Sequence, residues 1–363
     1  MSTAPRFEAP REERELLHAA RGGDEGAYLR LVEPHRAELH AHCYRMLGSV
    51  QDAEDALQDA LLRAWRGLAR FEGRSSVRSW LYRIATNTSL DTVARRPKRE
   101  LAIEYLAPAG PGEGPGDPLV ESIWVEPYPD EQLGLADGLA GPEARYELRE
   151  SIELAFVAAL QHLPPRQRAV LLLRDVLGFS AQETAESLDL TVASANSALQ
   201  RARKTVEERL PDRSQQAALR ELGDARIRDL VARYSDAIER ADLDALLALL
   251  TEDATWSMPP MPQWYQGREA LSYFLAEHAL RQDWRHVPAH ANGQAAVGCY
   301  MWHADRNAYV AEVIDVLTLE GERIAAVSAF VTTELFLRDD IADTPFETSA
   351  LFGRFGLPLE LPR

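Results

Sequence analysis

The segment 163–210 constrains the fold of this chain more than any other. It reads LPPRQRAVLLLRDVLGFSAQETAESLDLTVASANSALQRARKTVEERL. Its apolar spacing predicts a first helix from Pro165 to Leu177, which Gly178 ends. In the SAQE run, the serine and the glutamate have the spacing of a capping box and predict a second, short helix to Leu188. The segment therefore predicts a helix-turn-helix, a unit that often binds DNA.

The last helix of this segment has the composition of one that lies in the major groove. Asp189-Leu190 predicts a tight turn, and Thr191 can cap the helix that follows. Short polar groups stand near its start and cations stand further along, which suits base edges and phosphates respectively. The residues expected to contact DNA are Ser194, Asn196, Ser197, Gln200, Arg201 and Lys204. The alternative is a helical hairpin with a solvated basic end.

Composition limits the class of protein. A chain of 363 residues with 46% hydrophobic residues is long enough for two or three domains with buried cores. Residues 1–20 are charged, and no apolar run approaches the length of a bilayer span, so we expect no signal peptide and no membrane contact. Cys43 and Cys299 follow no metal spacing. We therefore expect two buried thiols in a reducing cytoplasm, with no metal and no cofactor.

The charge of the chain conflicts with simple DNA binding. The formal net charge is −17, and such a protein holds naked DNA poorly by itself. Either the DNA interpretation is wrong, or a basic partner supplies most of the attraction to the phosphates.

An acidic helix is predicted upstream. Ser49 opens a helix from about Asp52 to Arg70, with apolar residues at helical spacing on one face. Its first turns are crowded with polar residues: Asp52, Glu54, Asp55, Gln58 and Asp59. These carboxylates are explained equally well by the general preference for acids at a helix N-terminus and by a surface that docks on a basic partner.

The following helix carries a polar stripe. Ser76 can cap a helix from Val77 to Arg96, which Pro97 ends. Charged and polar residues recur along it at three- and four-residue steps. The residues expected to contact nucleic acid, with the loop before the helix, are Arg74, Ser75, Ser76, Arg83, Asn87, Asp91, Arg95 and Arg96. The alternative is a solvated, ion-paired face.

Together these segments resemble a known family. The runs QDAEDALQDALLRAW and FEGRSSVRSWLYRIATNTSLDTVARR, followed by the segment 163–210, are similar to the two conserved domains of bacterial sigma-70 factors. The small extracytoplasmic-function group, which keeps only those two domains, is the most similar. One departure is the last helix, where this chain has Asn196 and Ala198 and many members are more basic.

The resemblance implies partners and roles. The helix 52–70 would dock on the clamp helices of the largest subunit of core RNA polymerase. The segment 71–96 would bind and open the minus-ten element of promoter DNA, and the helix 191–206 would read the minus-35 element. The polymerase would then provide the basic surface that this acidic chain lacks.

Residues 100–141 predict a linker that is acidic and rich in Pro and Gly. One island in it, Ile123 to Asp130, carries Trp124 and Tyr128, which a solvated linker does not explain. We expect this island to dock, either in the polymerase cleft or on the last domain of the chain. A helix over 142–162 is predicted to follow.

Residues 224–340 predict helices followed by a curved antiparallel sheet, an α+β cone. The order of elements and the Asp253-Ala-Thr-Trp run resemble the SnoaL-like, nuclear-transport-factor-like family. Such cones enclose an apolar pocket. The residues expected to line it are Trp256, Met258, Trp264, Tyr265, His286 and Trp302. We expect no catalytic residue among them, and a cone that regulates or binds a small-molecule ligand.

The sequence thus predicts a multidomain protein with two all-α sigma domains, the second a helix-turn-helix, followed by an α+β SnoaL-like cone. The predicted boundaries are 15–99, 100–141 for the linker, 142–210, 224–340 for the cone, and 341–363 for an apolar tail that packs on the cone or between domains. The leading function is promoter recognition for RNA polymerase, regulated in cis by the cone. The alternatives are a ligand-controlled repressor, which would bind its operator without polymerase, and a small-molecule enzyme fused to a DNA-binding module.

Overall fold

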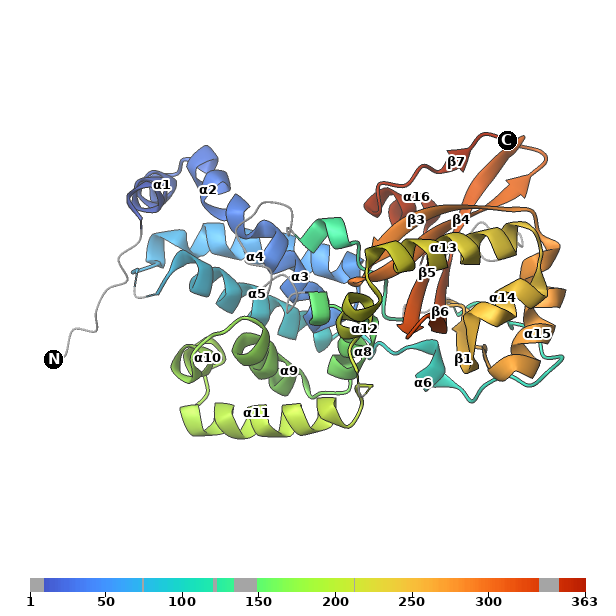
Figure 1. Ribbon diagram of the computed structural model, residues 1–363. Helices are drawn as coiled ribbons and strands as arrows, with labels where there is room; N and C mark the ends of the chain where they lie inside the picture. The colour runs from blue at the N-terminus through green and yellow to red at the C-terminus, as the bar shows by residue number, and fades with distance from the viewer. Residues whose placement is uncertain (1–9, 74, 120–122, 134–148, 212, 333–345) are drawn as a thin grey trace. The chain divides into compact units, whose positions relative to one another are not determined.

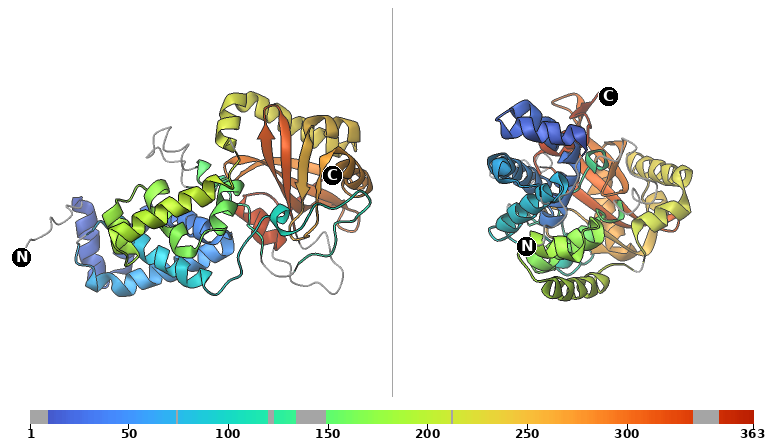
Figure 2. Two further views of the ribbon diagram at one scale, coloured as in Figure 1. Left: turned by 90° about the horizontal axis from the view of Figure 1, so that it is seen from below. Right: turned by 90° about the vertical axis from the view of Figure 1, so that its left-hand side faces the viewer.

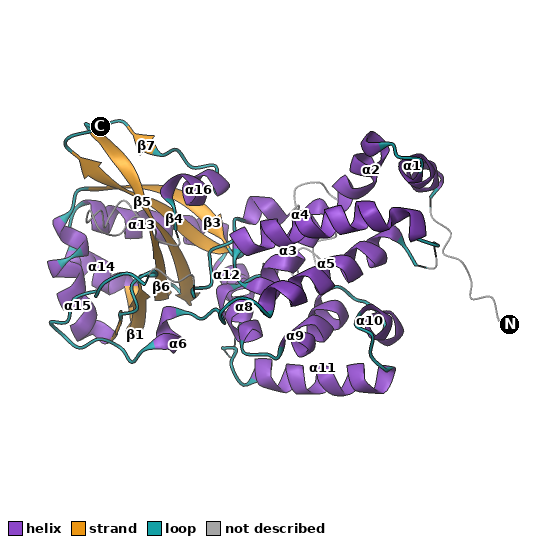
Figure 3. Ribbon diagram, turned by 180° about the vertical axis from the view of Figure 1, so that it is seen from behind, coloured by secondary structure: helices purple, strands orange, loops and turns teal. Residues whose placement is uncertain are grey.

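The chain forms two compact units. The computed structural model describes residues 10–73, 75–119, 123–133, 149–211, 213–332 and 346–363 (Figure 1). The first unit comprises residues 1–98, 132–139 and 156–209, and the second comprises 99–131, 140–155 and 210–363. In Figure 3 every strand drawn belongs to the second unit. No helix of the described residues is both long and apolar enough to cross a membrane.

The first unit begins with a helical domain. Its helices are α1 (Arg11–Arg21), α2 (Glu25–Val32), α3 (Arg36–Leu47), α4 (Val50–Gly67) and α5 (Val77–Val93). The Ser49 hydroxyl accepts the Asp52 amide at 3.1 Å and so opens α4, while Gly48 ends α3 in the left-handed region at φ 70°. α3, α4 and α5 bury a common apolar face, which includes Leu57 and Leu81.

The helix-turn-helix completes this unit. α8 (Leu154–Gln161) leads to α9 (Pro165–Leu171), which continues as a π-helical turn (Leu172–Val176); α10 (Ala181–Ser187) and α11 (Val192–Glu207) follow. The helix expected over 142–162 is interrupted in its described part: residues 149–150 are helical, 151–152 form a turn, and α8 begins at Leu154. Backbone groups at the interruption bind tertiary partners, because the Ile152 carbonyl accepts from Asn292 Nδ2 at 2.7 Å and the Leu154 amide donates to Gln294 Oε1 at 3.2 Å. Residues 134–148 lie outside the described residues.

The second unit contains a mixed sheet with helices packed on it. Its helices are α6 (Ala102–Tyr105), α12 (Gln215–Leu222), α13 (Asp224–Glu239), α14 (Leu243–Leu249), α15 (Gly267–Glu277) and α16 (Thr348–Arg354). Its strands are β1 (Leu250–Ser257), β2 (Trp264–Gln266), β3 (Trp284–Ala291), β4 (Gln294–His303), β5 (Ala308–Glu320), β6 (Arg323–Val331) and β7 (Glu360–Leu361). The strand order is β2-β1-β6-β5-β4-β3, with β7 beside β5; among the strands of the described residues, only β1 and β6 pair in parallel.

The two faces of this sheet are covered by different parts of the chain. Alternate residues such as Val297, Cys299 and Val313 join the core that α13, α14 and α15 cover. The intervening residues point the other way, where the Tyr300 ring meets the Phe352 ring of α16 at a centroid distance of 5.4 Å. Figure 2 shows α13 and α16 on opposite sides of the sheet. The described part of the tail thus packs on the outer face of the cone.

The linker island packs in the same unit as the cone. Trp124 is 1% exposed and Tyr128 is fully buried. The Tyr128 amide donates to Asn292 Oδ1 at 2.8 Å, and the Asn292 amide donates to the Tyr128 carbonyl at 2.8 Å. Asn292 and Gly293 turn β3 into β4 at φ 56° and 69°, the left-handed geometry that an Asn-Gly hairpin turn needs. Of the two docking places expected for the island, the structure therefore has it on the last domain.

Candidate functional site

α11 presents a polar face opposite a buried one. Ala195, Leu199 and Ala202 pack into the helix-turn-helix core. The residues expected to contact DNA, Ser194, Asn196, Ser197, Gln200, Arg201 and Lys204, are all exposed. Ala198, noted above as a departure from more basic family members, is buried and belongs to the core. The face that remains can hydrogen-bond base edges and carries cations toward its C-terminal end.

Local capping fixes how α11 is presented. The Ser180 hydroxyl accepts the Glu183 amide at 3.1 Å, and the Ser180 amide donates to the Glu183 carboxylate at 2.9 Å, so the expected capping box is present. The Thr191 hydroxyl accepts the Ser194 amide at 3.1 Å. On α11 itself, Arg203 makes a bidentate ion pair with Asp175 at 2.7 and 2.8 Å, which ties the helix to the preceding π-helical turn.

The polar stripe of α5 meets the turn of the helix-turn-helix. Arg83 forms an ion pair with Asp189 at 3.4 Å, and the Asn87 side chain donates to the Ser187 carbonyl at 3.5 Å. Further along α5, Asp91 pairs with Arg63 at 2.8 Å. Three of the residues expected to contact DNA, Arg83, Asn87 and Asp91, are therefore engaged within the first unit.

The remaining residues of this set are placed differently. Ser76 caps α5 by accepting the Ser79 amide at 3.0 Å, Ser75 is half-buried, and Arg95 is exposed. Arg96 pairs with Asp52 at 3.3 Å. Arg74 lies outside the described residues.

The acidic residues of α4 divide into two groups. Asp55, Gln58 and Asp59 are exposed on the helix surface. Asp52 is buried against Arg96, and Glu54 pairs with Arg36 and His40, both at 3.5 Å. The exposed group is thus available to a partner, whereas the engaged group stabilises the domain.

Buried Arg168 connects α9 to α3 and is a residue that sequence reasoning missed. Its guanidinium donates to Gln161 Oε1 at 2.6 Å, to the Gln161 and Leu163 carbonyls at 3.2 and 3.4 Å, and to the Met46 carbonyl. Burial lowers the pKa of Arg168 to about 10. A lone arginine in a helical pattern carries no local signal that it will bind carbonyls far away in the sequence.

The cone encloses a cavity of about 350 Å³. Trp256, Met258 and His286, which were expected in the pocket, line it. Trp264 and Tyr265 do not; they hold the linker, because Trp264 Nε1 donates to the Leu106 carbonyl at 2.7 Å and the Tyr265 hydroxyl donates to the Glu113 carbonyl at 2.8 Å. Trp302 lies apart, with its ring 5.1 Å from that of Tyr309.

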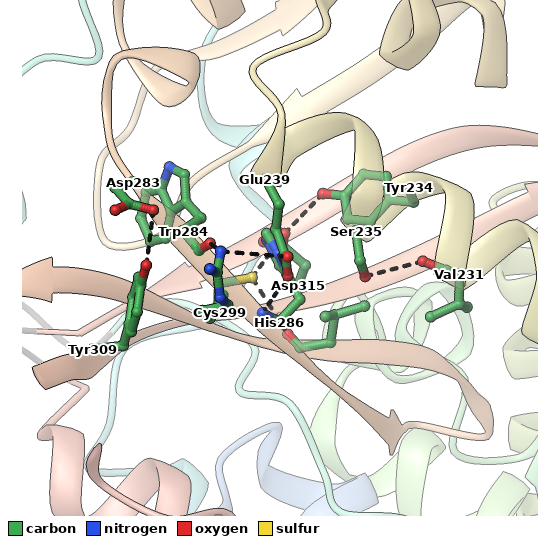
Figure 4. Close-up of polar contacts among 12 residues, drawn as sticks. Val231, Tyr234, Ser235, Glu239, Asp283, Trp284, His286, Cys299, Tyr309 and Asp315 are labelled. Atoms are coloured by element: carbon green, nitrogen blue, oxygen red, sulfur yellow. Dashed lines mark hydrogen bonds and ion pairs between the residues drawn. The ribbon is translucent and has the colours of Figure 1, made fainter. Parts of the chain in front are cut away.

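Three residues that line this cavity, His286, Cys299 and Asp315, make polar contacts with neighbouring side chains (Figure 4). Asp315 is buried, and its Oδ2 accepts the Tyr234 hydroxyl at 2.8 Å and the Cys299 thiol at 3.2 Å. Burial raises the pKa of Asp315, although the two hydrogen bonds oppose the shift. His286 Nδ1 lies 3.2 Å from Glu239, whose pKa is lowered by that hydrogen bond. No group of His, Cys, Asp and Glu in the described ranges is arranged to hold a metal ion.

Comparison with known proteins identifies three domains. Residues 31–99 match sigma-70 region 2, residues 153–206 match sigma-70 region 4, and residues 231–327 match the SnoaL-like domain. The ECF RNA polymerase sigma factor SigG of Mycobacterium tuberculosis is 41% identical over 333 residues, which cover 89% of this chain and 85% of SigG. The chain belongs to the extracytoplasmic-function (ECF) family of RNA polymerase sigma factors.

Other relatives of this ECF sigma factor differ in length. SigW of Bacillus subtilis is 28% identical and covers 52% of the chain, while the chain covers 92% of SigW. The crystal structure of SigJ from Mycobacterium tuberculosis superposes with a TM-score of 0.52 at 21% identity, covering 88% of this chain and all of that one. Together with the SnoaL-like match, this likeness confirms the expected fold class, two helical domains followed by a cone.

Proposed function

We propose that this ECF sigma factor directs core RNA polymerase to promoters through three separate surfaces. The exposed group on α4, Asp55, Gln58 and Asp59, contacts a basic surface of the polymerase. The α5 stripe with its preceding loop binds the minus-ten element, and α11 reads the minus-35 element. The observation that carries the proposal is the two-sided α11, in which an alanine- and leucine-lined face is buried and every residue of the polar set is exposed.

The acidity of the chain supports a division of labour with the polymerase. A net charge of −17 opposes tight binding to free DNA. Both arginines of α5 lie in ion pairs, Arg78 with Glu38 and Arg83 with Asp189, and beyond the helix Arg96 pairs with Asp52. A repressor acting alone would need more free positive charge on these surfaces.

Transcription in vitro with purified core polymerase tests whether α11 reads the minus-35 element. We expect Arg201→Ala to lower transcription from a promoter with an intact minus-35 element by roughly 10- to 100-fold, the cost of about 1–3 kcal/mol for one base contact. Arg203→Ala is the matched control from the same helix, because Asp175 already holds Arg203. Equal losses for the two variants would contradict the assignment of α11 as a base reader.

We further propose that the cone regulates the sigma domains in cis by holding the linker between them. The support for this proposal is that four residues of the cone form hydrogen bonds with the linker: Trp264, Tyr265, Asn292 and Gly293. The same hairpin turn also holds the chain just before α8, where Asn292 Nδ2 donates to the Ile152 carbonyl at 2.7 Å.

Truncation after residue 213 tests this second proposal. The full-length and truncated proteins are compared for holoenzyme formation and for transcription from one promoter. We expect the truncation to change transcription by tenfold or more, on the order of 1.4 kcal/mol of coupling. Unchanged promoter binding and transcription would contradict regulation in cis while leaving promoter recognition intact.

A further inference from the structure

Apolar residues form most of the wall of the cone's cavity, among them Trp256, Phe274, Trp284 and Val313. The acids and imidazoles in its lining are Glu277, His278, His286 and Asp315. None of its lining residues in the described chain is Lys or Arg. A carboxylate or phosphate ligand would therefore meet buried acidic groups with no cation to balance it, so the cavity selects against anions.

His286 and Asp315, which both line the cavity, each have an atom that can bind a ligand. In Asp315, Oδ2 already accepts two donors, so Oδ1 is the oxygen left to serve a ligand. In His286, Nδ1 is held by Glu239, and Nε2 has no hydrogen-bond partner in the part of the chain that the structure describes. The His286 side chain is 1% exposed and lines the cavity, so its free nitrogen can be satisfied only from within.

We propose that this cavity binds a neutral, largely apolar small molecule that carries one hydroxyl group, held between His286 and Asp315. A hydroxyl both donates and accepts a hydrogen bond. It therefore satisfies the pair whichever of the two groups carries the proton, whereas a carbonyl satisfies only one of them. The apolar remainder of the ligand packs against the tryptophan and phenylalanine walls.

The linker forms part of the same site. Pro115 lines the cavity. On either side of it, the Ala109 amide donates to the Trp264 carbonyl at 2.7 Å and the Leu119 amide donates to the Pro260 carbonyl at 3.0 Å. A ligand in the cavity gains its contact with Pro115 only while the linker is docked, so ligand binding strengthens linker docking. This regulatory step depends on the proposed control in cis, but the binding step does not.

Calorimetry on the full-length protein tests the ligand class with two probe series. The first is naphthol, naphthalene and naphthoate; the second is borneol and bornane. We expect each alcohol to bind roughly 10- to 100-fold more tightly than its hydrocarbon, as one or two hydrogen bonds to partly charged groups provide, and naphthoate not to bind. If neither alcohol binds more tightly than its hydrocarbon, the ligand class is wrong.

Two substitutions on β3 test whether His286 binds the hydroxyl group of the ligand. His286→Asn should abolish the preference for the alcohol, while His290→Asn, on the same strand but outside the cavity, should keep it. Retention of the preference in His286→Asn would overturn the site. If Asp315→Asn folds, it should also lose the preference for the alcohol; if it does not fold, the result for His286→Asn is the test of the site.

Hydrogen exchange tests the link to the linker. With saturating naphthol, the Ala109 and Leu119 amides should exchange severalfold more slowly than in the free protein. Unchanged exchange would overturn the coupling. Because these measurements contain no polymerase, their failure leaves promoter recognition standing, and a failed transcription assay leaves the ligand site standing.

Discussion

Each unit buries an ionisable side chain close in sequence to the start of the helix-turn-helix, and the two are used in opposite ways. In the first unit, Arg168 donates to carbonyls at the ends of α3 and α8. In the second unit, Glu153 accepts the amides of Gln215 and Gln216 at 3.0 and 2.7 Å, at the start of α12. Within the described residues neither forms an ion pair: Glu153 is held by two backbone amides, and Arg168 by backbone carbonyls and the Gln161 side-chain oxygen.

The difference between them lies in protonation. Burial lowers the pKa of Arg168 to about 10, so it remains charged at any physiological pH. Burial raises the pKa of Glu153 to about 7, against the effect of its two amide donors. The charge of Arg168 is therefore permanent, whereas that of Glu153 is sensitive to pH.

The largest expected effect comes from removing the permanent charge. Arg168→Met leaves the Met46, Gln161 and Leu163 carbonyls without their donor. We expect the free energy of unfolding of the first unit to fall by about 2–4 kcal/mol, with little change between pH 5 and 9. Denaturant unfolding measures it, with the exposed Arg166→Met in the same helix as control. A loss that varied with pH would break the comparison.

The next effect is the pH dependence of the second unit. A carboxyl whose native pKa lies above its unfolded value contributes stability below pH 4.5, and this contribution disappears as pH rises through about 7. Relative to Glu153→Gln, the wild-type chain should therefore lose on the order of 2 kcal/mol between pH 4.5 and 8. Unfolding of both proteins at several pH values measures this difference. Parallel curves for the two proteins would show that Glu153 does not titrate there.

A smaller effect on stability is expected from a substitution of Gln216, whose backbone amide donates to Glu153. The Gln216 side chain donates to the Gly293 carbonyl, at the turn between β3 and β4. Gln216→Ala should cost about 1 kcal/mol in a thermal melt of the second unit, independent of pH. The exposed Gln266→Ala is the control, and a cost that appeared only above pH 7 would mean that the variant acts through Glu153.

The smallest effect belongs to an exposed pair. Arg83 and Asp189 are 49% and 83% exposed, so their ion pair contributes no more than about 1 kcal/mol. Asp189→Asn removes the charge and keeps a residue that tolerates φ 53°. We expect holoenzyme affinity for minus-ten DNA to rise by less than about fivefold, measured by fluorescence anisotropy. A tenfold change would show that this pair is as strong as the buried groups.

Local patterns predicted much of this molecule. The fold class, the capping box and the strand-rich cone followed from spacing and turn residues, because those signals lie within a few positions of one another. The pocket set was predicted only in part: Trp256, Met258 and His286 line the cavity, while Trp264 and Tyr265 bind the linker.

The contacts that escaped prediction join residues far apart in the chain. Arg168 and Met46 are separated by 122 positions, and Tyr234 and Asp315 by 81. Periodicity shows that a residue is buried but not which distant atom it meets. The interruption of the helix at residues 151–152 escaped prediction for the same reason, since its backbone groups bind Asn292 and Gln294, 140 positions away.

The docking of the linker island on the hairpin turn also has a consequence for synthesis at the ribosome. Tyr128 and its partner Asn292 are 164 positions apart. At about 5–20 residues per second, the linker island is translated roughly 8–30 s before Asn292, and the second sigma domain, which ends near residue 210, is complete roughly 4–16 s before it. During that interval a nascent chain carries its promoter-reading surfaces without the domain proposed to restrain them, so each newly made molecule passes through an unrestrained period that a mature one does not.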